Sequence, residues 1–255
     1  GTAIKVTWTG ISGVDIYTTA SFSTNPANWT LTQSGLAAAS YTDTGVVGTG
    51  NNKFYKVVPA GTALTAILLA QDIVGKIDFS LSEGWNLITP AVVASAEIGT
   101  VFGSQLTPGA ASALADSVYG NYNGASYERA WLSATGWKNA SGGIATMQIV
   151  PGQGYWIRIV SGHGAKKVTI CGPVKQSDHT LTIRNGWNLV GSPFAADSSA
   201  TILAPTAAQG ATAGGASGLA DNIYANFSGI AYQRIWLSAT GWKDTANGQA
   251  TTTIS

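Results

Sequence analysis

The sequence predicts an all-β chain: a small β-sandwich followed by two tandem β-rich repeat modules. Three observations support this prediction. Apolar and polar residues alternate over short segments, turn residues separate these segments, and one block of sequence recurs. Helix signals are weak, and only residues 95–102 are expected to form a short helix. With 255 residues, the chain is long enough to bury more than one core.

The first part of the chain is expected to form strands separated by turns. Ile4, Val6 and Trp8 alternate with polar residues, which is typical of a half-buried strand. Tyr41 to Gly45 is interpreted as a turn, because Asp and Gly are common turn residues. The strands expected in this part are 4–8, 14–18, 29–32 and 54–58.

An internal repeat defines the rest of the chain. The motif GWNL at residues 84–87 returns 102 residues later, and the eight residues 131–138 return unchanged 105 residues later. Within each copy, Ser-Ala-Thr-Gly is expected to form a hairpin turn between two strands. Further strands of the first copy are expected at 77–81, 154–160 and 167–171. The sequence thus predicts three parts: residues 1–75, a first repeat module at 76–175 and a second at 176–255.

Both kinds of part resemble known families. The motifs VTW, VDIY, NW, SYTDTG and KFYKVV, spread over about the first 70 residues, resemble a fibronectin type III module that lacks its first strand. The repeats resemble GWNL/GYWI-type modules of secreted bacterial surface proteins, through motifs at 84–87, 115–119, 131–137 and 151–157. The second resemblance implies a non-catalytic modular protein that is extracellular or on the cell surface.

The second repeat module is expected to be incomplete at its C-terminus. Residue 255 corresponds to residue 150 of the first copy, so the segments 154–160 and 167–171 have no counterpart. A sheet without these strands would leave backbone N–H and C=O groups unpaired. Two interpretations remain open. The chain is a fragment of a longer one, or another subunit donates the missing strand and so builds a fibre or sheet.

Composition excludes several classes of function. Charged residues are 10% of the chain and the net charge is +1, so no basic field exists to hold nucleic acid. No apolar run approaches the ~18 residues of a membrane span, so we expect no membrane insertion. Cys171 is the single cysteine; it cannot form an internal disulfide and is expected to be a small core residue.

We find no catalytic, cofactor or metal motif in the sequence. His163 and His179 belong to no metal-binding pattern and are interpreted as surface or loop residues. Asp116 recurs as Asp221, which favours a structural role in capping backbone N–H groups at a turn. With Asn121 and Asn226 nearby, these carboxylates are still too few for calcium, which takes six to eight oxygen ligands. We therefore expect no enzyme activity.

The aromatic residues give the one candidate binding site. Tyr127, Arg129 and Trp131 would share one face of a strand, with Trp137 across the hairpin. This set is either a flat platform for a sugar ring or ordinary sheet packing, and packing is favoured. The tryptophans of GWNL and GYWI, Trp85, Trp156 and Trp187, are expected to be buried. The second copy repeats the candidate platform as Tyr232, Arg234, Trp236 and Trp242.

The expected function is therefore a non-catalytic extracellular structural or adhesive protein of a bacterial surface layer, fibre or secreted matrix. The expected partners are further copies of the chain or other surface proteins. The alternative is a set of carbohydrate-binding accessory modules of a larger secreted enzyme, with a polysaccharide as partner.

Overall fold

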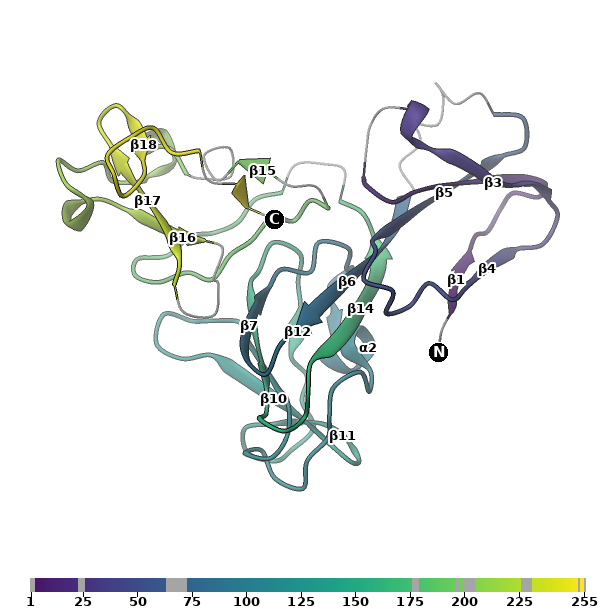
Figure 1. Cartoon of the computed structure of the whole chain (residues 1–255), viewed down its shortest axis with the longest axis horizontal. Coiled ribbons are helices and arrows are strands. Elements are labelled where there is room, and N and C mark those ends of the chain that lie inside the picture. Colours follow the sequence, from purple (N-terminus) through teal and green to yellow (C-terminus); the bar gives the residue numbers. More distant parts are fainter. Residues whose placement is uncertain are drawn as a thin grey trace. The chain divides into compact units, whose positions relative to one another are not determined.

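The computed structural model describes an all-β chain (Figure 1). It divides into two compact units, residues 1–195 and 196–255. These units differ from the three parts expected from the sequence, and the expected boundary at residue 75 falls inside the strand β6 (Ile73–Leu81). The described residues are 3–22, 26–62, 73–175, 179–195, 198–199, 205–225, 231–251 and 253–254.

The start of the first unit forms two antiparallel sheets. In one, β1 pairs with β4; in the other, five strands lie in the order β14-β6-β5-β2-β3. The residues expected to form a turn at 41–45 lie mostly in β4, where buried Asp43 accepts hydrogen bonds from Lys53 and Tyr55. The strands are β1 (Ala3–Thr7), β2 (Val14–Thr19), β3 (Thr30–Leu36), β4 (Ser40–Thr44), β5 (Lys53–Pro59) and β14 (Lys166–Pro173), and a short 3-10 helix η1 (Pro26–Asn28) precedes β3.

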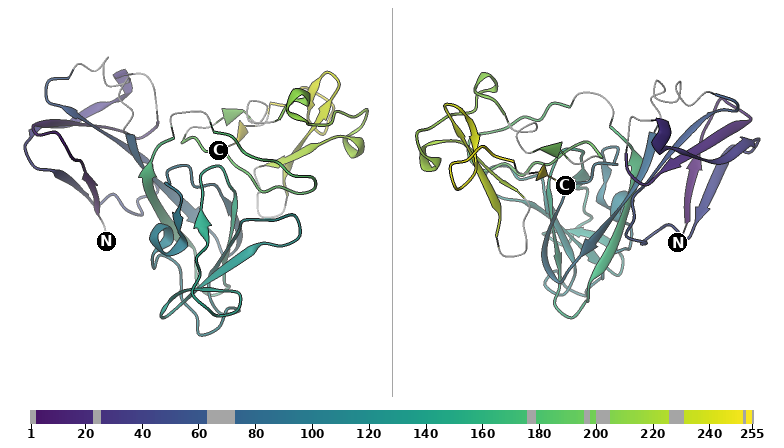
Figure 2. Two further views of the ribbon diagram at one scale, coloured as in Figure 1. Left: turned by 180° about the vertical axis from the view of Figure 1, so that it is seen from behind. Right: turned by 45° about the horizontal axis from the view of Figure 1, so that its top comes forward.

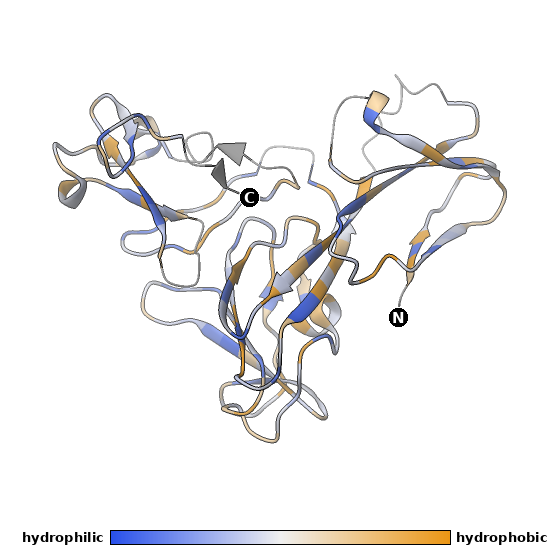
Figure 3. Ribbon diagram, in the orientation of Figure 1, coloured by the Kyte–Doolittle hydropathy of each residue, from blue (hydrophilic) through white to orange (hydrophobic). Residues whose placement is uncertain are grey.

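The five-stranded sheet joins the fibronectin-like segment to the first repeat module. β14 pairs with β6 along its whole length, from Lys166 opposite Leu81 to Pro173 opposite Val74. Hydrophobic and hydrophilic residues alternate along β6, so one face of the strand packs on a core (Figure 3). Cys171 in β14 is exposed, so the expectation that it is a core residue is wrong. The two segments therefore share one sheet rather than meeting at a linker.

The buried ion pair of Lys76 and Asp78 links this shared sheet to the loop before β5 through hydrogen bonds. The Nζ of Lys76 lies 2.8 Å from Oδ2 of Asp78, and both side chains are fully enclosed. Lys76 also donates to the carbonyl of Val46, while Asp78 accepts from the N–H of Gly50 and the hydroxyl of Thr169. Burial raises the pKa of Asp78, but the hydrogen bonds from Lys76, Thr169 and Gly50 outweigh it and hold the pKa below its usual value.

A second carboxylate, that of Asp15 in β2, binds main-chain N–H groups beside this sheet. Asp15 in β2 accepts backbone N–H groups from Gly61 and Gly35, both at 2.9 Å, and the hydroxyl of Ser34 at 2.8 Å. These hydrogen bonds, with that of Gly61 the largest contributor, lower the pKa of Asp15.

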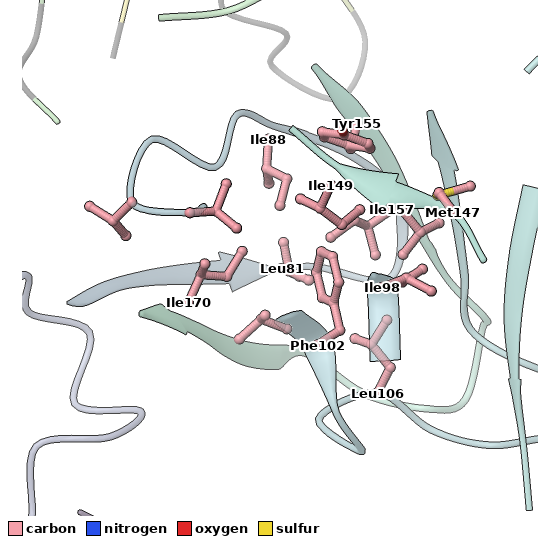
Figure 4. Packing of buried hydrophobic residues seen from close by; sticks show 14 of the residues in the cluster. Leu81, Ile88, Ile98, Phe102, Leu106, Met147, Ile149, Tyr155, Ile157 and Ile170 are labelled. Carbon is pink, nitrogen blue, oxygen red and sulfur yellow. The ribbon is translucent and has the colours of Figure 1, made fainter. Parts of the chain in front are cut away.

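The first repeat module adds a second five-stranded antiparallel sheet, in the order β11-β10-β9-β13-β7. Between the sheets lies a dense apolar core, to which the short helix contributes Ile98 and Phe102 beside Ile157 and Leu81 (Figure 4). The helix covers residues 98–102 of the segment expected at 95–102, in which residues 96–97 instead form the short strand β8. The hairpin turn expected in the first copy joins β10 to β11. The elements are β7 (Gly84–Ile88), β8 (Ala96–Glu97), α2 (Ile98–Phe102), β9 (Ser117–Gly120), β10 (Glu128–Ser133), β11 (Gly136–Asn139), β12 (Gln148–Ile149), which pairs with β8, and β13 (Tyr155–Ile159).

Residues 179–195, the start of the second copy, belong to the first unit. Val190 forms a β-bridge with Gln153, and the N–H of Gly154 donates to the carbonyl of Leu189 at 3.3 Å. In the first copy GWNL forms β7 and pairs with β13. The second GWNL forms no strand among the described residues and lies instead beside the turn that leads into β13.

The second unit repeats the middle of the first module on a smaller scale. Its sheets are β16-β17-β18 and β15-β19 (Figure 2). The small core contains Ala211, Ile235, Leu237, Trp242 and Ala250, with Ile223 packed against it. The elements are β15 (Ser198–Ser199), η2 (Ala207–Gln209), η3 (Ser217–Leu219), β16 (Asn222–Ala225), β17 (Gln233–Ser238), β18 (Gly241–Lys243) and β19 (Thr253–Ile254).

Candidate functional site

The four tryptophans of the expected sugar platform are buried. Their exposed fractions lie between 7% and 9%, and three of the indole N–H groups donate to carbonyls. Trp137 and Trp242 belong to the two hydrophobic cores, on the sheet face opposite to Trp131 and Trp236. Their ring faces are therefore not open to a sugar. Of the expected set, only Tyr127 and Tyr232 are exposed, at 39% and 43%.

The two arginines of that set stack on rings that do not belong to it. Arg129 lies 5.3 Å from the centre of the Tyr119 ring, which stands directly across on β9. Arg234 takes the same position over Tyr224, at 5.6 Å. Each guanidinium also donates to a main-chain carbonyl, that of Ser112 in the first copy and that of Ser217 in the second. Cross-strand pairing, rather than the order along one strand, decides which ring each arginine meets.

The tryptophans of GWNL and GYWI are not buried, and the expectation that they form core is wrong. Trp85 is 48% exposed, Trp187 is 66% exposed and Trp156 is half-buried. In β13, Tyr155, Ile157 and Ile159 point into the core. Because side chains alternate between the faces of a strand, Trp156 must point outward.

An outward aromatic cluster, Trp85, Tyr119 and Trp156, forms where β7, β13 and β9 run side by side. The ring centres of Trp85 and Tyr119 are 5.0 Å apart, and those of Trp85 and Trp156 are 6.3 Å apart with the rings nearly perpendicular. Arg129 adds a cation over Tyr119. Aromatic faces beside a guanidinium can stack on a sugar ring or another flat group. The alternation within YWIRI is the sequence signal that could have located this cluster.

Asp116 anchors the end of β13. Its side chain is buried, and its Oδ2 accepts the backbone N–H of Thr107 at 2.8 Å. Its Oδ1 accepts the N–H of Val160, just after β13, at 2.9 Å and lies 2.7 Å from Nδ1 of His163. The expected capping of backbone N–H groups is present. The contact with His163 was not expected, since 47 residues separate the two in sequence.

Asp221, the counterpart of Asp116, lies in a different environment. Its Oδ2 accepts the N–H of Thr212 at 2.8 Å, which repeats the bond made by Thr107. The residue is exposed, however, and no described residue donates a hydrogen bond to its Oδ1. Among the described strands, β16, which follows Asp221, lies at one edge of its three-stranded sheet, whereas β9 lies between β10 and β13.

Other chemistry is sparse in the described ranges. They contain no group of three or more His, Cys, Asp and Glu residues that could hold a metal ion. They also contain no helix that is long and apolar enough to cross a membrane. His179 lies beside Gly152, where the second GWNL segment packs.

No protein-family model, curated protein or solved structure matches this chain. The resemblances to fibronectin type III modules and to GWNL/GYWI-type modules therefore remain predictions. Two features of the structure bear on function: the outward aromatic cluster, and the position of β16 at an edge of its sheet among the described strands.

Proposed function

We propose that the chain is part of a non-catalytic extracellular protein of a bacterial surface layer, fibre or secreted matrix, with a structural or adhesive role. The observation that carries this proposal is the pair of unequal repeats. The second unit reproduces β8 to β12 of the first as β15 to β19, but its β16 is an edge strand among the described residues. An edge strand offers backbone groups to a neighbouring chain, which is how many fibres and layers grow.

Two further features support an assembly role. The charged fraction of 10% is low, so like-charge repulsion between copies is weak. The two-stranded sheet β1-β4 and the strands β3-β2-β5-β6 of the five-stranded sheet, which β14 completes, are consistent with a fibronectin-like sandwich, a type of module common in extracellular proteins. The proposed partners are copies of the same protein or other surface proteins.

Sedimentation and negative-stain electron microscopy test this proposal. The purified chain should form ordered polymers as its concentration rises, and antibodies against it should label intact cells of the organism that makes it. A chain that stays monomeric at all concentrations and is found only inside cells would contradict both the role and the location.

The outward aromatic cluster favours a second candidate function, carbohydrate binding as an accessory region of a larger secreted enzyme. Soluble polysaccharides should then quench tryptophan fluorescence. Trp85→Ala should abolish this quenching, while Tyr127→Ala, which removes an exposed ring outside the cluster, should leave it unchanged. Absence of quenching across a broad glycan panel would exclude this function.

A further inference from the structure

We propose that the outward aromatic cluster binds an acidic polysaccharide, with a sugar ring stacked on the open face of Trp85 and the anionic group of that sugar paired with the guanidinium of Arg158. This inference rests on the second candidate function, carbohydrate binding, and names the class of polysaccharide. It joins two observations: an aromatic ring that is held in place but open to solvent, and an arginine beside it that has no partner among the described residues.

Trp85 in β7 is a fixed ring with an open side. Its ring centre lies 5.0 Å from that of Tyr119 on β9, on the far side of β13, and 6.3 Å from that of Trp156. Tyr119 is held in turn by the guanidinium of Arg129, 5.3 Å from its ring centre. With these contacts made, Trp85 is still 48% exposed. A flat apolar surface that is already ordered can stack on a sugar ring with little further loss of side-chain entropy.

Arg158 lies beside this ring on the same face of the sheet. It stands directly across from Trp85 in the antiparallel pair of β13 and β7, and it follows Trp156 by two residues in β13. Its neighbours Ile157 and Ile159 pack into the core, so its own side chain points outward. Arg158 is half-buried, and its side chain forms no ion pair, hydrogen bond or cation–π contact with any residue that the structure describes.

The charge of this face favours an anionic sugar over a neutral one. Arg129 on β10 and Lys138 on β11 share the outward face with Arg158. The one acidic residue of the five strands, Glu128, precedes Arg129 and therefore belongs to the other face, where it accepts a hydrogen bond from Asn121 at 2.6 Å. An anionic group on the sugar would thus meet positive charge without a competing carboxylate from these strands.

Two carboxylates at the ends of these strands are occupied elsewhere. Glu83, just before β7, accepts the N–H groups of Gly162 and Gly164 at 2.9 and 2.8 Å. Asp116, just before β9, is buried and binds its own three donors. Neither forms an ion pair with Arg158, which is therefore the cation that remains for a ligand beside Trp85.

The chemistry of the guanidinium defines the anion. It is planar and always charged, and it can donate two parallel N–H bonds to a carboxylate or to a sulfate. Polysaccharides with either group meet this requirement, because both place an anion on a sugar ring. The shared chemistry is therefore a sugar ring with an anionic substituent, and the two sources are separated by experiment.

Two pairs of polysaccharides test the proposal with the whole chain. Polygalacturonate is compared with its methyl ester, and dextran sulfate with dextran, so that each pair differs in charge on one backbone. Calorimetry and tryptophan fluorescence measure the dissociation constants. At least one acidic member should bind at least about tenfold more tightly than its neutral partner, which identifies the anion. Raising NaCl from about 50 mM to about 0.5 M should remove most of this difference.

Variants of Arg158 test its role directly. Arg158→Gln should weaken binding of the acidic polysaccharide about tenfold and leave binding of its neutral partner unchanged. Arg158→Lys should restore part of the affinity, since lysine keeps the charge but loses the two parallel donors. Lys167→Gln is the charge-matched control: it removes one positive charge from an exposed residue of β14, in the other sheet, and should leave binding unchanged.

Three results would overturn the proposal. The first is equal affinity for the acidic and neutral members of both pairs, and the second is full binding of the acidic polysaccharide by Arg158→Gln. The third is binding of a single-stranded oligothymidylate as tightly as the acidic polysaccharide, because the partner would then be a nucleic acid.

Carbohydrate binding can fail separately from this inference. Binding of neutral polysaccharides that is lost in Trp85→Ala but unchanged in Arg158→Gln would leave carbohydrate binding in place and refute the acidic class. Absence of binding by every polysaccharide would refute both.

Discussion

Replacing Asp116 with asparagine should destabilise the first unit by about 2.5–6 kcal/mol, far more than the same change at Asp221. The buried carboxylate of Asp116 receives three donors, from Thr107, Val160 and His163. An asparagine keeps one acceptor oxygen and turns its NH₂ group toward at least one backbone N–H. One hydrogen bond to a charged group is then lost, at about 1.5–3 kcal/mol, and one buried donor stays unpaired, at about 1–3 kcal/mol.

At Asp221 the same substitution should cost less than about 1 kcal/mol. The residue is exposed, and the asparagine oxygen can still accept the N–H of Thr212. Hydrogen exchange during urea titration separates the two effects, because it reports opening at β13 and at β17 independently in the intact chain. Equal losses at the two sites, or an unchanged first unit in Asp116→Asn, would refute the view that this carboxylate holds the end of β13.

Three further predictions probe the rest of the fold. Because the pKa of Asp15 is lowered by folding, its contribution to stability is complete above its ordinary value of 3.8 and is lost as the pH falls through the lowered pKa. Asp15→Asn should therefore lower the free energy of unfolding at neutral pH and reduce its decrease at acid pH, as measured by urea titrations at a series of pH values. An unchanged decrease at acid pH would contradict this. Lys76→Met should lower the free energy of unfolding in urea by about 3–5 kcal/mol, since it leaves the buried Asp78 without its cation. The double variant Lys76→Met/Asp78→Asn should lose less stability than the sum of the losses in the two single variants. Strict additivity would show that the pair does not interact. Trp85→Ala should cost less than about 1 kcal/mol and Trp137→Ala about 3–5 kcal/mol, and similar costs would show that their burial is misassigned.

Alternation along short segments was enough to predict most strands of the first unit. The expected segments 14–18, 54–58 and 154–160 all lie in or around observed strands. Alternation could not tell which face of a strand is buried. Trp156 and Ile157 are both apolar, and only the position of β13 between β7 and β9, over the core of Ile98 and Phe102, decides that Ile157 is inside.

Long-range pairing explains the difference in domain boundaries. β6 pairs with β5 at one edge and with β14 at the other, although β14 begins more than eighty residues later in the sequence. A repeat seen in the sequence marks where similar segments start, but it carries no information on which sheet each segment joins. The buried pair of Lys76 and Asp78, which ties the loop before β5 to this sheet, likewise unites residues that the sequence divides between two parts.

The WLSATGWK hairpin and its surroundings separate local from non-local control. Trp131 and Trp236 each donate an indole N–H to the carbonyl eight residues ahead, and both hairpins have the same register. The local sequence therefore fixes the hairpin whether or not a strand lies beyond it. The burial of Asp116 and Val118, by contrast, depends on β13, and their counterparts in the second unit remain more exposed. Identical sequence thus gives the same hairpin in both copies, whereas the burial of the neighbouring strand depends on whether a strand such as β13 is described beside it.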